Sequence, residues 1–162
     1  DIDTMNYGYL NSLVAQSVAV KERIVEEDPK EKGIRKALNF GHTIGHAYES
    51  LSFIKERPIL HGHAVAAGIV SELYLSHVMC GFPMEKVRQV VYYIKEYYPA
   101  FGFDCTDYER LYELMTHDKK NEGGVINFTL LAQVVDVRIN QQVTKARILE
   151  SLDFYRESMG MQ

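Results

Sequence analysis

The chain is organised around the stretch Arg35-Lys36-Ala37-Leu38-Asn39-Phe40-Gly41-His42-Thr43-Ile44-Gly45-His46-Ala47. His42 and His46 stand four residues apart, which on a helix places both imidazoles on one face, one turn apart. A second run, Leu60-His61-Gly62-His63-Ala64-Val65, follows, so that four of the six histidines lie in these two segments. Such spacing is typical of metal ligands. The glycines beside the histidines disfavour a helix by about 1 kcal/mol each, which indicates close approach of a backbone, a substrate or a metal.

Composition limits the classes of protein to which the chain can belong. Its 162 residues carry a net charge of -4 and 46% hydrophobic residues, without a basic excess and without an apolar run long enough to span a bilayer. These values predict one domain over residues 1–162, with no nucleic-acid or membrane partner. Cys80 and Cys105 form no CxxC pattern and follow no signal peptide, so we expect reduced thiols in a cytoplasmic protein. The absence of an initiator Met at Asp1 suggests a fragment.

Apolar periodicity predicts a mainly α fold. Helices are expected over residues 4–27, 34–51, 62–79, 84–98, 107–115 and 144–158, with Asp107 as the cap of the fifth. The β-rich residues 125–131 and the alternating residues 134–139 predict a short two-stranded element near 125–139. The charged, glycine-bearing residues 117–124 read as a loop, and loops of this kind often carry function.

The histidines admit more than one interpretation. An HExxH metalloprotease needs a Glu after the first histidine, and that position is Thr43, so this interpretation fails. Helices joined by a short connection pack side by side, so His42 and His61 can converge on one ion. The alternative is that the histidines are core or capping residues bonded to backbone. A catalytic zinc usually has three protein ligands, and only these two are convincing; the acidic residues within 26–31 are left unassigned.

The run LNFGHTIGHA, followed by LHGHAV and then by Asp118-Lys119-Lys120-Asn121, resembles the carboxy-terminal domain of 3-dehydroquinate synthase. The similarity extends back through Lys21–Val25 and Glu31–Arg35. Members of this family have a nucleotide-binding α/β domain followed by a helical metal-binding domain. The resemblance implies that only the second domain is present here, and that the missing metal ligand is a Glu upstream of this chain.

The resemblance also implies a reaction and its residues. In this family 3-deoxy-arabino-heptulosonate 7-phosphate becomes 3-dehydroquinate and phosphate, in the shikimate pathway, with NAD as a recycled oxidant and zinc or another divalent metal. His42 and His61 would bind the metal. The residues expected to face the substrate are Lys21, Arg35, Asn39, His46 and one of Lys119 and Lys120. Glu31 would orient the site, and His46 would move a proton. NAD would be held mainly by the absent domain, so the fragment alone should be inactive.

Two departures from the family pattern accompany the resemblance. His63 stands where the family commonly has a Glu, and the segment between the two histidine runs is longer than usual. A related sugar-phosphate cyclase or a metal-dependent polyol dehydrogenase is the enzymatic alternative, although Arg35 and the lysine-bearing loop favour an anionic substrate. A helical interaction module without catalysis is the alternative from another class. The resemblance is compatible with a homodimer.

Overall fold

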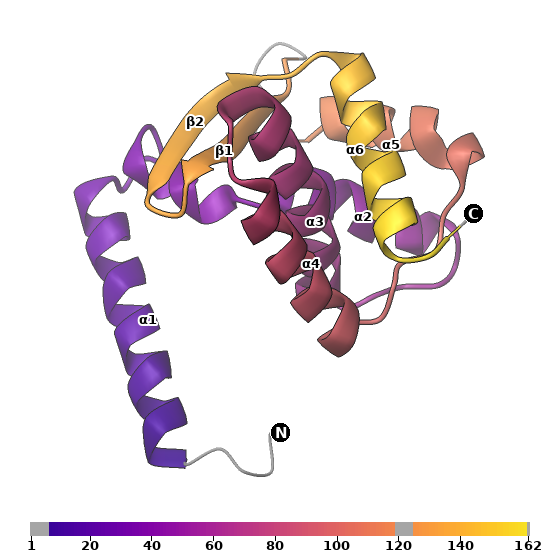
Figure 1. The fold of residues 1–162 in the computed structure, drawn as a ribbon. Helices are drawn as coiled ribbons and strands as arrows, with labels where there is room; N and C mark the ends of the chain where they lie inside the picture. The colour runs from indigo at the N-terminus through magenta and orange to yellow at the C-terminus, as the bar shows by residue number, and fades with distance from the viewer. Residues whose placement is uncertain (1–6, 119–124, 162) are drawn as a thin grey trace. The chain divides into compact units, whose positions relative to one another are not determined.

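The computed structural model of the chain describes residues 7–118 and 125–161. Its contacts divide the chain into two compact units, Asp1–Leu38 and Asn39–Gln162. The predicted mainly α class with a two-stranded element is confirmed (Figure 1). The single domain over residues 1–162 stays a prediction.

The first unit is dominated by one long helix. Helix α1, Tyr7–Glu27, confirms the first predicted helix over its described part. Its apolar residues form a row of exposed side chains, namely Tyr9, Leu13, Val14, Val18 and Val20. The turn that follows is closed by Asp28, whose carboxylate accepts the backbone N–H groups of Lys32 at 3.0 Å and Gly33 at 2.6 Å. These hydrogen bonds favour the ionised carboxylate and lower the pKa of Asp28.

The helix predicted over residues 34–51 is wrong as a single element. A 3-10 helix, η2, covers Ile34–Asn39, and helix α2 begins only at His42 and runs to Ile54. Gly41 separates the two with a φ of 80°. A Cβ at Gly41 would lie 2.5 Å from Cγ1 of Ile69, so both the backbone angle and the crowding require glycine. The break makes His42 the first residue of its helix.

Helix α3, His61–Cys80, is the centre of the second unit. It packs against α2, α4 (Met84–Tyr97), α6 (Lys145–Ser158) and strand β1 (Asn127–Gln133) (Figure 1). It is buried on most sides, as its apolar sequence predicts; its fully buried residues include Ala64, Val70, Ser71, Glu72, Leu75 and Ser76. An ionisable residue, Glu72, therefore lies inside the core.

Glycines set the separation of α2 and α3. A Cβ at Gly68 would lie 2.1 Å from the carbonyl oxygen of Gly41 and 2.6 Å from the nitrogen of Gly45. A Cβ at Gly45 would lie 3.1 Å from the carbonyl oxygen of Ala64. The backbones of the two helices thus touch where the histidines begin, which confirms the close approach that the sequence predicted.

A hairpin and the remaining helices complete the second unit. Strands β1, Asn127–Gln133, and β2, Asp136–Gln142, pair antiparallel, and the Ser76 hydroxyl accepts the N–H of Leu131 at 3.0 Å. A short 3-10 helix, η3 (Cys105–Asp107), precedes α5, Tyr108–Thr116. Asp107 is the N-cap residue of α5, as predicted. Its side chain makes no capping hydrogen bond, because its carboxylate accepts hydrogen bonds from the N–H of Asp104 and from Lys55 Nζ.

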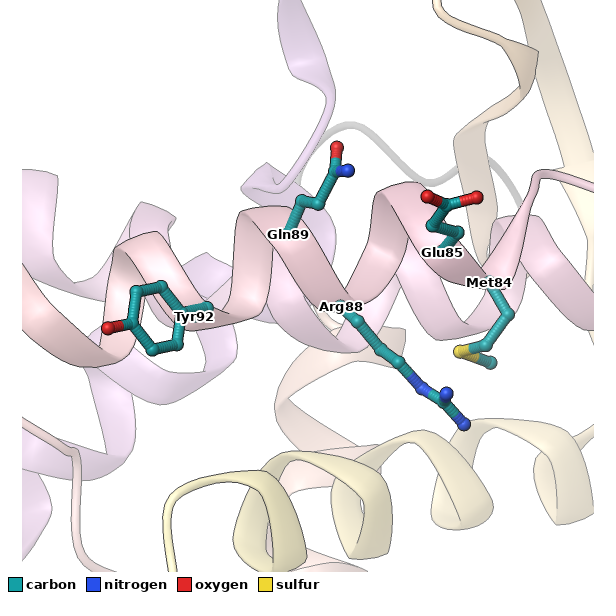
Figure 2. Close-up of a pocket in the computed structure, with 5 residues that line it drawn as sticks. All are labelled: Met84, Glu85, Arg88, Gln89 and Tyr92. Carbon is teal, nitrogen blue, oxygen red and sulfur yellow. The ribbon is translucent and has the colours of Figure 1, made fainter.

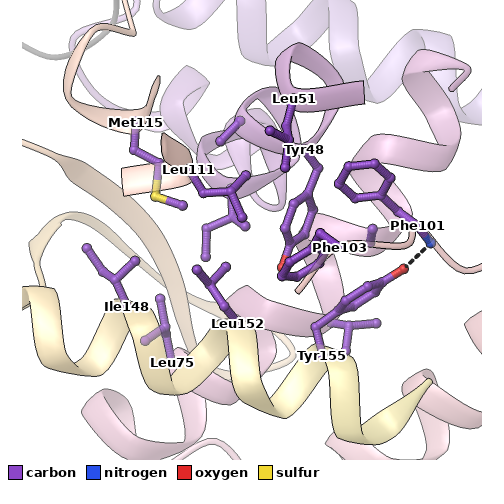
Figure 3. Packing of buried hydrophobic residues seen from close by; sticks show 14 of the residues in the cluster. Tyr48, Leu51, Leu75, Phe101, Phe103, Leu111, Met115, Ile148, Leu152 and Tyr155 are labelled. Carbon is purple, nitrogen blue, oxygen red and sulfur yellow. Dashed lines mark hydrogen bonds between the residues drawn. The ribbon is translucent and has the colours of Figure 1, made fainter. Parts of the chain in front are cut away.

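The core between α2, α5 and α6 is aromatic (Figure 3). Tyr48 packs against Phe101, Phe103 and Tyr155, with ring centroids 5.2–5.5 Å apart. The Tyr155 hydroxyl accepts the N–H of Phe101 at 2.8 Å, and burial raises the pKa of this hydroxyl. This packing holds Tyr48 of α2 in the core. Cys80 and Cys105 are free thiols, as predicted. Among the described helices, none has the length and apolar character needed to cross a bilayer.

Candidate metal centre

Three imidazoles meet where α2 and α3 begin. His42 and His46 come from successive turns of α2, and His61 is the first residue of α3. Their ring centroids are 5.4–5.8 Å apart in all three pairs. Each histidine offers a ring nitrogen that lies within 4.8 Å of those of the other two. The structure therefore brings together both predicted metal ligands and the predicted proton carrier.

Each of the three rings is held at Nδ1 by an acceptor. His42 Nδ1 lies 3.0 Å from the carbonyl oxygen of Phe40. His61 Nδ1 lies 2.9 Å from Glu49 Oε2, and His46 Nδ1 lies 3.2 Å from Asp118 Oδ2. A backbone carbonyl and an ionised carboxylate only accept hydrogen bonds, so the proton of each neutral ring belongs on Nδ1. This leaves the Nε2 lone pairs to act as ligands or bases.

The donor set fits a divalent transition metal. Zinc takes imidazole nitrogens at about 2.0–2.1 Å, and histidine ligands usually donate their other ring N–H to a carboxylate or a backbone carbonyl. All three rings already have such partners. His61 is exposed while His42 and His46 are half-buried, so the cluster opens to solvent on the His61 side. An open side leaves room for a further ligand or a substrate.

The remaining predicted site residues within the described ranges lie on α1, in the turn after it and in η2. Lys21 is exposed on α1, and Glu31 is half-buried in the turn after α1 with a φ of 54°. Arg35, in η2, donates from Nη1 to the carbonyl oxygen of Pro29 at 3.0 Å. These three belong to the first unit, whereas Asn39, at the end of η2, belongs to the second.

Two further sets of sequence predictions remain. Lys119 and Lys120 lie outside the described residues. His63 does not join the cluster of three imidazoles found among the described residues; its ring packs edge-on against Tyr98, with centroids 5.7 Å apart.

Three acidic residues around the cluster were missed from the sequence. Glu49 lies one turn after His46 on α2, a helical spacing that could have indicated it. Asp118 opens the lysine-bearing loop, but its pairing with a histidine 72 positions earlier left no local signal. Glu72 is the sole charged residue between His63 and His77, and a carboxyl group in such an apolar helix is itself a signal.

An open pocket on α4 offers a contrast to this cluster (Figure 2). It is lined by Met84, Glu85, Arg88, Gln89 and Tyr92, all from one helix. These side chains include one carboxylate and no imidazole, and they do not converge from several elements. The histidine cluster, with donors from two helices, is therefore the better candidate for chemistry.

The fold and the cluster together define the class of protein. The chain is a helical domain with a candidate metal centre, formed by three oriented imidazoles on two helices that pack through glycine. Residues 1–121 match the family described as 3-dehydroquinate synthase C-terminal, and the chain belongs to this family.

Relatives named 3-dehydroquinate synthase agree with this assignment. The chain is 86% identical over 161 residues to one from Parabacteroides distasonis, which covers 99% of this chain and 46% of the relative. It is 37% identical to one from Corynebacterium diphtheriae over 130 residues, covering 80% of this chain and 35% of the relative. The relative from Staphylococcus aureus is 34% identical over 148 residues, covering 90% of this chain and 40% of the relative. The chain thus spans less than half the length of these relatives.

Proposed function

We propose that this chain is the metal-binding part of a longer 3-dehydroquinate synthase, a lyase that converts 3-deoxy-arabino-heptulosonate 7-phosphate to 3-dehydroquinate and phosphate. The observation that carries the proposal is the cluster of His42, His46 and His61. The match of residues 1–121 to the 3-dehydroquinate synthase C-terminal family also supports the proposal. Three imidazoles from two helices converge so that their ring nitrogens lie within 4.8 Å of one another, and this convergence favours a metal site over an interaction module.

His42 and His61 are proposed as the metal ligands. Both present Nε2 because Phe40 and Glu49 occupy their Nδ1 atoms. The third ligand is proposed to be a Glu in the part of the longer protein that this chain does not include. When bound, zinc or another divalent metal would lower the pKa of the substrate hydroxyls at the carbon to be oxidised.

His46 is proposed to handle protons. With Nδ1–H donated to Asp118 Oδ2, its Nε2 can accept a proton from a substrate hydroxyl, and the Asp118 carboxylate stabilises the resulting imidazolium. Asp118 also orients the ring, because it holds the proton on Nδ1. This division leaves two imidazoles for the metal and one for proton transfer.

The residues proposed to hold the substrate are Lys21, Arg35, Asn39 and one of Lys119 and Lys120, with Glu31 as an orienting acid. The substrate carries a carboxylate and a phosphate, which guanidinium and ammonium groups bind by charge-assisted hydrogen bonds. Arg35 uses one N–H on the Pro29 carbonyl and keeps further donors for a bidentate contact with the carboxylate. NAD is proposed to bind mainly outside this chain, and a homodimer is proposed as the assembly.

Metal titration tests the proposed centre. Zinc added to the metal-free chain, in competition with a chromophoric chelator, should bind with micromolar or poorer affinity because an anionic ligand is missing. The double variant His42→Ala/His61→Ala should abolish this binding without loss of helical circular dichroism. His63→Ala is the matched control, because His63 lies outside the cluster, and it should bind zinc as the parent does. Binding that survives the double change, or a double variant that unfolds, contradicts the proposal.

Phosphate release tests the proposed reaction. The longer protein should release phosphate from the heptulosonate substrate in the presence of NAD, whereas the isolated chain should release none. Arg35→Lys in the longer protein should lower kcat/KM by the equivalent of about 1–3 kcal/mol, because a point ammonium cannot reproduce a bidentate contact. An unchanged kcat/KM removes Arg35 from the site.

A further inference from the structure

Helix α2 begins without a capping side chain of its own. Its N-cap residue is Gly41, which makes no side-chain hydrogen bond to the first turn. The first N–H groups of a helix have no partner within the helix and usually bond to a Ser, Thr, Asp or Asn at the N-cap. No such residue fits at Gly41, because Ile69 Cγ1 and the Val65 carbonyl oxygen would lie 2.5 and 3.2 Å from its Cβ.

Helix α3, whose residues crowd Gly41, also places a carboxyl group beside the first turn of α2. Glu72 of α3 is fully buried, and its Oε2 accepts the N–H of Ile44 at 3.2 Å. Backbone N–H groups of Gly41 and Thr43 also favour its ionised form. Thr43 and Ile44 are the second and third residues of α2, the positions at which an N-cap side chain acts. Among the described residues, nothing hydrogen-bonds the other carboxyl oxygen, Oε1.

We infer that Glu72 of α3 acts as the N-cap of the neighbouring helix α2. We also infer that it is a positioning residue for His42, the first residue of α2. This inference rests on the proposed metal-binding function of His42. The orientation of the His42 ring depends on the path of residues 40–44, since its Nδ1 bonds to the carbonyl oxygen of Phe40. A capped first turn fixes both the Phe40 carbonyl and the His42 Cα, and so keeps a ring nitrogen of His42 within 4.8 Å of those of His46 and His61.

Three residues on one face of α3 contribute to the position of His42. His61, Gly68 and Glu72 are separated by seven and four residues, a spacing that places them on one face of α3. His61 contributes an imidazole, Gly68 lets the backbones touch, and Glu72 closes the first turn of the neighbouring helix. The position of His42 relative to His61 is therefore set by α3 itself.

The test uses three variants of the whole chain. Glu72→Gln keeps an oxygen acceptor at the cap, whereas Glu72→Met keeps a similar shape and removes it. Ser71→Ala is the matched control, because it deletes a buried hydrogen bond between α3 and Tyr48 of α2, 2.7 Å long, without touching the first turn. Each variant is measured for amide hydrogen exchange, for the tautomer of His42 from ¹⁵N resonances, and for zinc affinity.

Loss of the acceptor should give a defined pattern. In Glu72→Met the Thr43 and Ile44 amides should exchange at least tenfold faster relative to those later in α2, and His42 should show mixed tautomers. Zinc affinity should fall about 10- to 100-fold, the usual effect of removing a group that orients a ligand. Glu72→Gln and Ser71→Ala should keep the Nδ1–H tautomer and a zinc affinity within about threefold of the parent.

Other results separate the possible failures. Unchanged exchange and tautomer in Glu72→Met overturn the inference, and so does a loss of zinc affinity in Ser71→Ala as large as that in Glu72→Met, which would indicate general loosening. If the parent chain binds zinc through other residues, so that binding survives His42→Ala/His61→Ala, the proposed function fails instead. In that case the exchange and tautomer measurements, made without metal, still decide whether Glu72 positions His42.

Discussion

Helices α1 and α3 have nearly the same length, yet their sequences and environments differ: α1 alternates apolar and polar residues at helical spacing, whereas α3 is apolar on most sides. Val14 and Val18 on α1 are 55% and 49% exposed, whereas Val70 on α3 is 0% exposed. α3 meets helices on several sides and a strand, and it carries the glycine contact and the buried Glu72. The stability that a helix gains from its apolar side chains thus depends on what covers them. Four predictions test this difference.

The largest effect is expected at Gly68. In Gly68→Val the new side chain would overlap the Gly41 carbonyl and the Gly45 backbone, so α2 and α3 must separate. We expect a loss of about 3 kcal/mol or more in the free energy of unfolding by urea. Gly62→Ala, on the same helix, is the control, since a Cβ there meets nothing within 4 Å. A stable Gly68→Val chain would show that the close approach is dispensable.

The pH dependence of stability should report the buried Glu72. Burial raises the pKa of its carboxyl from 4.5 to about 8 in the folded chain, so between these values the folded state holds a proton that the unfolded state has lost. Stability should therefore fall as pH rises through this window, by up to about 1.4 kcal/mol per unit, and level off above pH 8. Urea unfolding of the metal-free chain should show this slope, and Glu72→Gln should lack it. Equal slopes in both proteins would contradict a buried, titrating Glu72.

A smaller effect is expected between Tyr48 and Ser71. Their buried hydroxyls lie 2.7 Å apart, so Tyr48→Phe leaves Ser71 without this partner and should cost about 1–2 kcal/mol. Thermal and urea unfolding of the single and double variants form a cycle. Adding Ser71→Ala to Tyr48→Phe should recover part of the loss; strict additivity would show that the two hydroxyls do not interact.

The smallest effect is expected on α1. Val18→Ser replaces an exposed apolar side chain by one of similar helix propensity, so the free energy of unfolding should change by less than about 0.5 kcal/mol. A loss well above 1 kcal/mol would show that this face of α1 is covered in solution, and the contrast with α3 would disappear.

Sequence reasoning was strongest where the determinants are local. The four-residue spacing correctly placed His42 and His46 on one helical face, and the short connection placed His61 beside them. It failed at Gly41, because the apolar pattern continues through this residue. The left-handed φ of Gly41 accompanies close packing against Ile69 and Val65 of α3, which the local sequence does not indicate. Asp118 was not assigned a role for a similar reason. Nothing near His46 in the sequence indicates that its partner follows α5, 72 residues later.

The origin of all three imidazoles in residues 42–61 has a consequence for the order of folding. Two consecutive helices close a short loop, which costs little chain entropy and favours early contact. Glu72 follows on the same helix, so the capped helix pair is expected to assemble while α5, the hairpin and α6 are still unstructured. Asp118 must then arrive from 72 residues away. The two proposed ligands would thus take their relative positions before the proposed proton carrier acquires its carboxylate.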